Sequence, residues 1–406
     1  IAQLAGTKQK LYFEWGSSFF DTDTAKLAAT DTNSDGVNDA DAIAGADVVL
    51  AYVGTLAMQS VCLTNPNETT ENCSAGGLTA ASDSSEDEDR VSLDLSRGQD
   101  KMIQLVSGLN PKTVAWMQTV ATRNVEPFKD KVAGLVWTSY NGQAQARNVA
   151  ATLFGEVNPS GRLPYSNYSD ITQLPDTKDY QMTPDGSHAG RTYQYFTKDV
   201  TYPFGYGLTY SKFEYSNLRL NSANVDVNGE LKATVTVKNT SARDGQEVVQ
   251  LYASSPKASD PLRPNIQLKG FEKVAVKAGA SKDVTITVKA SDLWFWNSDA
   301  DRKTFDLGTW KLYVGPSSDT STALTTTFKL SGYLAKGIDV VAAVPDGVVL
   351  NTEAPKNVIH ANLSATRTDQ SFYDLAKVAV SYTSSDPEVA AVDAGGAVRP
   401  VGQGLA

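Results

Sequence analysis

The acidic run Glu86, Asp87, Glu88 and Asp89, closed by Arg90, is a concentrated source of groups that could transfer protons. A carboxyl group acts as a general acid near neutral pH when burial or neighbouring negative charge raises its pKa. Asp87, Glu88 and Asp89 would raise the pKa of Glu86 in this way. An acidic run is also typical of a solvated surface loop. Residue type alone therefore leaves both interpretations open.

A second set of oxygen ligands lies upstream, at Asp31, Asn33, Asp35, Val37 and Asp39. The spacing matches the first part of a calcium-binding loop, and Gly36 stands where that loop needs glycine for a sharp turn. The bidentate glutamate that would close the loop is replaced by Ala42, so Asp41 or a distant group would have to substitute. We expect either a structural Ca²⁺ ion or an Asx-rich turn that leads into a helix over 41–46. No cofactor is expected for catalysis.

Histidine and cysteine are too few for several common sites. His188 and His360 lie in separate regions, which excludes a metal site of the H-E-x-x-H type and makes a Ser-His-Asp triad hard to assemble. Cys62 and Cys73 cannot supply a metal site of four thiolates. We expect them to form a disulfide, which would stabilise the fold by about 3 kcal/mol on the loop-entropy model. Two free surface thiols are the alternative.

Several local features point to a secreted or extracellular protein. Sequons for N-glycosylation, which fit a secreted eukaryotic glycoprotein, occur at Asn67, Asn72, Asn167, Asn239 and Asn362. The first residues lack the charged region and the apolar stretch of a signal peptide. We therefore interpret the chain as a mature fragment, or as a domain excised from something longer.

The composition is that of a globular protein without a basic surface. Of 406 residues, 41% are hydrophobic and 20% are charged, and 36 Lys and Arg against 46 Asp and Glu give a formal net charge of −10. Binding of nucleic acid or another polyanion is therefore not expected as the main function. No apolar run reaches the roughly 20 residues that cross a bilayer.

Hydrophobic periodicity predicts an α/β sandwich over residues 1–175, incomplete at its N-terminus. Continuous apolar runs at 48–53, 114–120 and 134–137 are typical of strands that are covered on both faces. Apolar residues around 102–106 and 146–154 recur at helical spacing. This order of elements implies an open, mainly parallel sheet with helices on its faces.

The rest of the chain divides into three further parts. Residues 176–212, rich in Pro, Tyr, Asp and Gly, predict an ordered connector that lies over the surface without an element of its own. Alternating apolar runs separated by turn signals predict an all-β sandwich over 213–333. A last β-type region, 334–406, stops without a final strand and looks truncated.

Motifs around the connector carry a family resemblance. They are Y-N-G-Q at 140–143, L-F-G-E-V-N-P-S-G-R-L-P at 153–164, G-R-T-Y-Q-Y-F at 190–196 and Y-P-F-G-Y-G-L-T-Y at 202–210. In this order they resemble the C-terminal half of glycoside hydrolase family 3, and the third is most like its β-xylosidase branch. D-G-Q-E-V-V-Q-L-Y at 244–252 resembles that family's fibronectin type III-like domain. The segment 384–402 is similar to the start of a bacterial immunoglobulin-like group 2 module, which implies a partial immunoglobulin-like domain.

The resemblance implies a retaining exo-glycosidase that removes terminal β-linked xylose or glucose. Such enzymes need two carboxyl groups about 5 Å apart. In this family an Asp nucleophile lies on an N-terminal (β/α)8 barrel, which is absent from these residues and would be the partner of this chain within one precursor. The acid/base precedes an Asp-Arg pair by three positions, which implies Glu86, with Glu88 one residue out of register as its rival. Asp89 and Arg90 are interpreted as a local ion pair.

The sequence departs from the family pattern at two points. The stretch between Gly54 and Glu86 is longer than in related chains, and Ala144 and Gln145 replace the residues that usually follow the Gly-Gln of the turn. Either change could reshape the sugar pocket or abolish activity. The residues that bind substrate are not identified. Connector aromatics could form a sugar platform, but packing between domains is the favoured interpretation for Tyr193, Tyr195, Phe196, Tyr206 and Tyr210.

A second interpretation belongs to another class of protein. The same modules could form a structural or adhesive extracellular protein without catalysis, because fold does not dictate function. Strand exchange between copies would then produce a homo-oligomer or a polymer. Hydrolytic activity and particle size distinguish the two interpretations.

Overall fold

The computed structural model describes residues 31, 36–54, 62–63, 72–75, 78–81, 92–95, 99–176, 178–297, 302–332, 338–342, 359–365 and 381–402. The chain divides into two compact units. The first comprises residues 1–219, 234–286 and 312–326, and the second comprises 220–233, 287–311 and 327–406. Among the described residues, no helix is long and apolar enough to cross a membrane.

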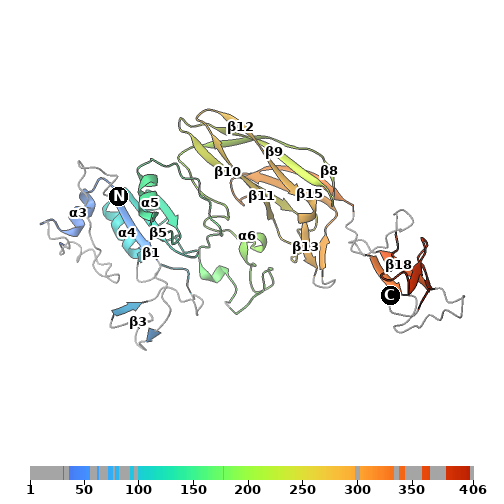
Figure 1. The fold of residues 1–406 in the computed structure, drawn as a ribbon. Helices are drawn as coiled ribbons and strands as arrows, with labels where there is room; N and C mark the ends of the chain where they lie inside the picture. The colour runs from blue at the N-terminus through green and yellow to red at the C-terminus, as the bar shows by residue number, and fades with distance from the viewer. Residues whose placement is uncertain are drawn as a thin grey trace. The chain divides into compact units, whose positions relative to one another are not determined.

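Three parallel strands form the sheet of the α/β part. They are β1 (Val49–Gly54), β5 (Thr113–Gln118) and β6 (Gly134–Thr138), in the order β1-β5-β6 (Figure 1). The parallel pairing and the places of these strands confirm the prediction. Their apolar runs are long enough for a strand and too short for a helix, which is why periodicity located them.

Helices accompany this sheet, as predicted. They are α3 (Asp39–Gly45), α4 (Gln99–Leu109) and α5 (Gln145–Leu153). Ile103 of α4 is fully buried in one core with Ala51, Val53 and Met117 of the sheet. The other face of the sheet is less covered than expected, because the ring of Tyr52 is 51% exposed.

A small antiparallel sheet lies between β1 and α4 in the sequence. It consists of β2 (Cys62–Leu63), β3 (Asn72–Ala75) and β4 (Leu78–Ala81) in that order. Its register places Cys62 opposite Cys73. Directly opposed residues have Cα atoms about 4.5–5.5 Å apart, within the range of about 4.4–6.8 Å that a disulfide requires. The backbone therefore favours the disulfide, which stays a prediction because these side chains lie outside the described part.

The connector is ordered but is not free of elements, contrary to the expectation. It contains the short helix α6 (Thr192–Tyr195), and a second short helix, η2 (Ile171–Gln173), lies just before it. Tyr168, Ala189 and Phe196 are buried together with Leu93, which gives the connector a small core of its own. Its Tyr and Phe residues supply the apolar area that sequence periodicity did not reveal.

Two sheets make up the β part that follows the connector. The first holds β11 (Gln267–Val276), β10 (Gly245–Ser254), β15 (Gly308–Gly315), β16 (Leu324–Ser331) and β8 (Asn224–Asp226); the second holds β12 (Ser281–Lys289), β9 (Glu230–Asn239) and β7 (Phe213–Leu220). The first sheet is mixed, since β8 pairs with β16 in parallel and β10 with β11 antiparallel.

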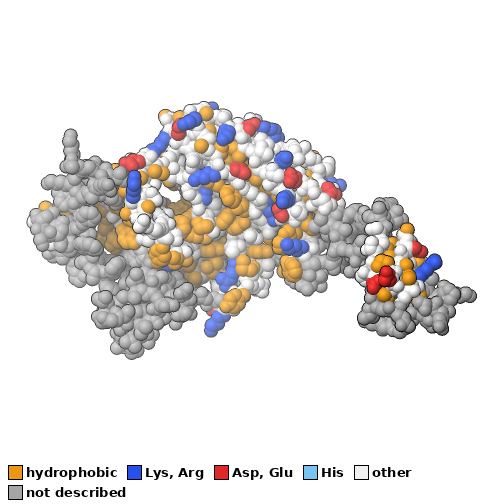
Figure 2. All heavy atoms as spheres, in the orientation of Figure 1, with side chains coloured by type: hydrophobic (Ala, Val, Ile, Leu, Met, Phe, Trp, Pro, Cys, Tyr) orange, Lys and Arg blue, Asp and Glu red, His pale blue; other side chains and the backbone are white. Residues whose placement is uncertain are grey.

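Alternation of buried and exposed residues confirms the predicted strands of this part. Every second residue of β9 from Leu231 to Val237 is buried. A Cβ atom on Gly270 of β11 would lie 2.5 Å from Ile286 of β12, so the two sheets approach closely face to face. On the face drawn in Figure 2, basic and acidic side chains are interspersed over these strands. Neither sign forms a continuous patch on that face.

Shorter elements complete the second unit. After η3 (Ala290–Asp292), β13 (Trp294–Asn297) and β14 (Arg302–Phe305) form a hairpin. The last sheet has the order β17-β18-β20-β19, with bounds Ile338–Ala342, Ile359–Ala365, Ala397–Pro400 and Ala390–Val392. Its pairs are antiparallel.

Candidate functional site

The predicted proton donor Glu86 and its rival Glu88 lie outside the described residues, as do Asp89 and Arg90. The chain that follows them is described and is fixed to the loop after β5. The backbone N–H of Asn124 donates to the carbonyl of Leu93 over 2.7 Å, and its Nδ2 donates to Oδ1 of Asp94 over 2.9 Å. These contacts fix residues 93 and 94 to the loop that follows β5.

The carboxyl edge of an open α/β sheet is where such folds bind ligands. Gln118, the last residue of β5, connects this edge to its neighbours. Its Oε1 accepts from the hydroxyl of Tyr52 over 2.7 Å, and its Nε2 donates to Oε1 of Gln145 over 3.2 Å. The same Oε1 of Gln145 accepts from the backbone of Asn141 over 3.0 Å. Gln145 departs from the family pattern. Its side-chain oxygen joins the Y-N-G-Q turn to Gln118 at the carboxyl edge.

Gln99, which the sequence did not reveal as special, terminates β1. Its side chain is buried, its Oε1 accepts from the N–H of Gly54 over 2.9 Å, and its Nε2 donates to the carbonyl of Gly54 over 3.0 Å. A side-chain amide can satisfy both backbone groups of one residue in this way. Since Gln99 begins α4, these bonds fix that helix to the edge. A glutamine at the start of an apolar helix was the only signal available.

A buried positive charge also lies beside this edge. Arg123, in the loop after β5, is 0% exposed, and none of the described residues accepts a hydrogen bond from its guanidinium. Its carbonyl accepts from Nδ2 of Asn167 over 3.0 Å. Arginine keeps its charge in proteins. A carboxyl group brought close to it would be favoured in the ionised form.

A third contact connects the edge with the start of the connector. Nε1 of Trp137, on β6, donates to the hydroxyl of Thr119, the residue that follows β5, over 2.9 Å. The ring of Tyr165 meets that of Trp137 edge to face, with centroids 5.2 Å apart. Burial raises the pKa of Tyr165 far above its ordinary value.

Tyr165 gives a testable pH dependence. Its folded-state pKa lies above the unfolded value near 10, so its contribution to stability is complete below pH ~10. Above that pH the unfolded phenol ionises while the folded one does not, and stability falls by about 1.4 kcal/mol per pH unit. In this pH range the free energy of unfolding of Tyr165→Phe should therefore fall less steeply with pH, by about 1.4 kcal/mol per pH unit. Urea titrations between pH 9.5 and 11.5 measure the slope.

The matched control is Tyr180→Phe, since the Tyr180 side chain is 86% exposed. This variant should keep the slope of the unmodified chain. Identical slopes for Tyr165→Phe and Tyr180→Phe would contradict the assignment of Tyr165.

Three of the motifs that carry the family resemblance meet in one place, which we call the joint. It consists of residues 158–164, 202–211 and 244–252. Leu163 donates to the carbonyl of Tyr206 over 2.8 Å, and Gly205 donates to the carbonyl of Leu163 over 2.9 Å. A Cβ atom on Gly207 would lie 2.3 Å from the carbonyl oxygen of Gly161. The absence of a side chain at Gly207 therefore permits close approach of the two backbones.

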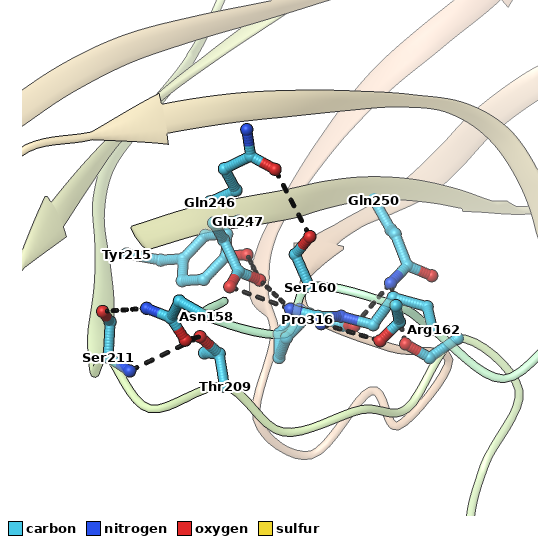
Figure 3. Close-up of polar contacts among 12 residues, drawn as sticks. Asn158, Ser160, Arg162, Thr209, Ser211, Tyr215, Gln246, Glu247, Gln250 and Pro316 are labelled. Atoms are coloured by element: carbon cyan, nitrogen blue, oxygen red, sulfur yellow. Dashed lines mark hydrogen bonds and ion pairs between the residues drawn. The ribbon is translucent and has the colours of Figure 1, made fainter. Parts of the chain in front are cut away.

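A buried ion pair crosses the joint (Figure 3). Nη2 of Arg162 lies 2.9 Å from both carboxylate oxygens of Glu247, and the two side chains are only 8% and 3% exposed. The hydroxyl of Tyr215 donates to Oε1 of Glu247 over 2.8 Å. Burial, together with the negative charge of Glu247, raises the pKa of Tyr215 far above its ordinary value.

Asn158 connects three segments of the joint through one side chain. Its Nδ2 donates to the hydroxyl of Ser211 over 2.8 Å and to the carbonyl of Asp244 over 2.9 Å, and its Oδ1 accepts from Thr209 and from the backbone of Tyr210. Its amide thus uses both donor hydrogens and both acceptor sites.

The aromatic residues of the connector pack against neighbours, as interpreted from the sequence. Tyr193 stacks on Phe204 at 4.2 Å, and its hydroxyl accepts from the backbone of Leu268 on β11. Tyr206 stacks on Tyr202, Phe196 meets Tyr168 edge to face, and the hydroxyl of Tyr210 donates to the carbonyl of Thr152. Burial raises the pKa of Tyr195. Packing thus holds these rings, although Tyr210 is still 47% exposed.

The predicted calcium loop is described only in part, because Asn33 and Asp35 lie outside the described residues. Oδ2 of Asp31 accepts from the N–H of Gly36 over 2.8 Å, and Gly36 has φ +87°. Asp39 is buried and Val37 is exposed.

Helix α3 begins at Asp39, two residues before the predicted start, because Oδ1 of Asn38 accepts from the N–H of Asp41 and caps it. This conformation fits the glycine turn of such a loop as well as an Asx-rich turn. Calcium binding therefore stays a prediction.

Two sequons are poor glycosylation sites in this fold. Asn167 is 4% exposed and Asn239 is 0% exposed. Nδ2 of Asn167 donates to Arg123, and that of Asn239 donates to the carbonyls of Arg243 and Val276. A glycan on either amide would break these bonds and would have no path to solvent. Asn67 and the side chains of Asn72 and Asn362 lie outside the described part.

Comparison with known proteins finds two domain families in the chain. The glycosyl hydrolase family 3 C-terminal domain matches residues 3–210, and the fibronectin type III-like domain matches residues 247–318. The first match contains the parallel sheet, its carboxyl edge and the connector. The second contains Glu247 and Gln250 of the joint.

Named relatives are similar over just over half of this chain. A xylan 1,4-β-xylosidase from Xylanibacter ruminicola is 31% identical over 231 residues, which are 57% of this chain and 25% of that protein. A thermostable β-glucosidase B from Acetivibrio thermocellus is 33% identical over 242 residues, 58% of this chain and 32% of that protein. The chain thus spans only a quarter to a third of these relatives.

Solved structures give the same result at the level of the fold. A β-glucosidase from Streptomyces venezuelae in complex with D-glucose has a TM-score of 0.57 at 28% identity, over 72% of this chain and 34% of that one. A β-glucosidase from Listeria innocua in complex with glucose has a TM-score of 0.58 at 25% identity, over 78% and 40% of the two chains.

Proposed function

Because this chain belongs to the glycosyl hydrolase family 3 by its C-terminal domain, we propose that it is the C-terminal portion of a retaining exo-glycosidase. The reaction is hydrolysis of terminal β-linked xylose or glucose. The observation that carries the proposal is the anchoring of residues 93 and 94 by Asn124, which fixes the chain that follows the acidic run to the loop after β5. The names of the relatives support the reaction class.

In the proposed mechanism Glu86 is the general acid/base. Its carboxyl proton passes to the glycosidic oxygen while an aspartate of the N-terminal barrel attacks the anomeric carbon, so that the leaving group departs as an alcohol. The ionised Glu86 then removes a proton from water, which displaces the aspartate and releases the sugar with its configuration retained. In this mechanism the barrel supplies the nucleophile, and this chain supplies the acid.

Glu86→Gln in the full-length precursor tests this role. We expect kcat/KM for a disaccharide to fall about 10²–10⁴-fold, because its leaving oxygen needs the proton. A nitrophenyl glycoside has a good leaving group, so its kcat/KM should fall far less. Glu88→Gln is the matched control and should leave both substrates nearly unaffected. Equal losses on both substrates, or a larger loss for Glu88→Gln, would overturn the assignment.

The remaining features of the sequence are part of the same proposal. We propose a secreted protein whose last segment, 384–402, belongs to an immunoglobulin-like module. The alternative, a structural or adhesive protein without catalysis, predicts a precursor that hydrolyses no glycoside and migrates as a polymer on a sizing column.

A further inference from the structure

We infer that Glu247 is a positioning residue for the carboxyl edge of the sheet, acting through Arg162, Tyr165 and Trp137. This inference rests on the proposed function, and it gives the β part a share in catalysis without contact with substrate. Every residue in the chain of contacts belongs to the first compact unit.

The first link fixes β10 to the segment that follows α5. A carboxylate that accepts two hydrogen bonds from one guanidinium nitrogen and a third from Tyr215 has little freedom of movement. Arg162 also donates through Nη1 to the carbonyl of Gly161 over 3.1 Å. Figure 3 shows the guanidinium pointing directly toward the carboxylate of Glu247. The position of Arg162 is therefore set by β10.

The second link connects the position of Arg162 to that of Tyr165. Residues 161–164 belong to no helix or strand, so their place depends on the contacts they make. Leu163 uses both backbone groups, its N–H toward Tyr206 and its carbonyl toward Gly205. Gln250 of β10 holds Gly205 in turn, by donating to its carbonyl over 3.0 Å. The segment before Tyr165 is thus held at two points by the same strand.

The third link reaches the edge itself. Tyr165 packs on Trp137, and Trp137 donates to the hydroxyl of Thr119. The backbone of Thr119 donates to the carbonyl of Thr138 over 3.1 Å, which joins the carboxyl ends of β5 and β6. Thr119 is fully buried. A shift of Arg162 would therefore be passed on to the carboxyl edge of the sheet.

Energetics favour a geometric role for the ion pair. Replacing both members of a buried ion pair by apolar residues is often neutral for stability, because desolvation offsets the attraction. What apolar residues cannot supply is the fixed direction of hydrogen bonds between a charged donor and a charged acceptor. A displacement of about 1 Å caused far from the chemistry can lower a rate about 10²-fold.

The test uses the double variant Arg162→Met/Glu247→Leu in the full-length precursor. We expect an unfolding midpoint close to that of the unmodified protein, kcat for a disaccharide lowered about 10–100-fold, and KM for the disaccharide changed less than about twofold. The control removes the exposed pair of Arg219 and Asp283, 2.5 Å apart on β7 and β12 of the same first unit. Arg219→Gln/Asp283→Asn should keep kcat.

Trp137→Phe breaks the chain of contacts at its other end. Because both variants would interrupt one sequence of contacts, their effects on kcat should not add in the combined variant. Unchanged kcat in a folded Arg162→Met/Glu247→Leu protein would overturn the inference. Additive effects with Trp137→Phe would do the same.

A readout without turnover separates this inference from the proposed function. The indole N–H resonance of Trp137, assigned with Trp137→Phe, should shift in Arg162→Met/Glu247→Leu and not in the control. A precursor that hydrolyses nothing but shows this shift would refute the glycosidase and keep the positioning. An unmoved resonance together with normal activity would refute the positioning alone.

Discussion

Arg162→Met is expected to lower the free energy of unfolding by about 3–5 kcal/mol, as typical for breaking a buried ion pair on one side. The carboxylate of Glu247 is 3% exposed, and without Arg162 its one remaining donor among the described side chains would be the hydroxyl of Tyr215. Methionine fills much of the volume of the arginine stem, so the loss reports the charge more than a cavity. Urea unfolding, monitored by circular dichroism, measures the effect.

The double variant is the control for this prediction. Arg162→Met/Glu247→Leu leaves no uncompensated charge and should recover most of the stability that Arg162→Met loses. Breaking the exposed pair by Arg219→Met should cost no more than about 1 kcal/mol, because solvent screens surface ion pairs. If Arg162→Met and Arg219→Met lowered the free energy of unfolding by the same amount, the prediction that burial makes loss of Arg162 costly would be wrong.

Local patterns predicted the elements of the α/β part but not the joint. The strands around Ala51, Ala115 and Leu135 follow from apolar runs that are visible in the sequence alone. Arg162 lies in a polar motif and has the pattern of a surface charge, yet its partner Glu247 lies in another motif far along the chain. Spacing carries no signal of such a contact, because tertiary packing decides which charge is buried.

The glycosylation sequons also show that a local pattern does not predict burial. The triplets at Asn167 and Asn239 have the polar character of a surface loop, but both amides serve as buried donors to backbone carbonyls. An Asn in a turn often satisfies the backbone in this way. A short pattern reports the residue types that chemistry needs and says little about burial.

The residues that identify the family have a structural meaning in this fold. The motifs at 153–164, 202–210 and 244–252 meet in the joint and not at the carboxyl edge. They specify how β10 is held against the segment after α5. The reaction is therefore inferred from motifs that build the joint. Glu86 is inferred to be the acid from its position in the sequence.

Gly205→Ala is expected to destabilise the chain by about 3–5 kcal/mol, combining left-handed strain with the loss of buried hydrogen bonds. Gly205 has φ +79°, and a Cβ atom there would lie 2.1 Å from Oε1 of Gln250 and 2.9 Å from the hydroxyl of Tyr252. The amide of Gln250 could make room only by leaving the carbonyls of Gly205 and Pro316. Urea unfolding and the soluble fraction on expression measure the outcome.

Two other glycines separate the causes. Gly279 has φ +71° with nothing within 4 Å of an added methyl group, so Gly279→Ala carries the backbone strain alone. Gly186 has open space and no such φ, so Gly186→Ala should be nearly neutral. The expected order of destabilisation is Gly205, then Gly279, then Gly186. If Gly205→Ala and Gly279→Ala had equal urea midpoints, the side chain of Gln250 could move aside without loss of stability. The hydrogen bonds of Gln250 would then contribute little to the stability of the joint.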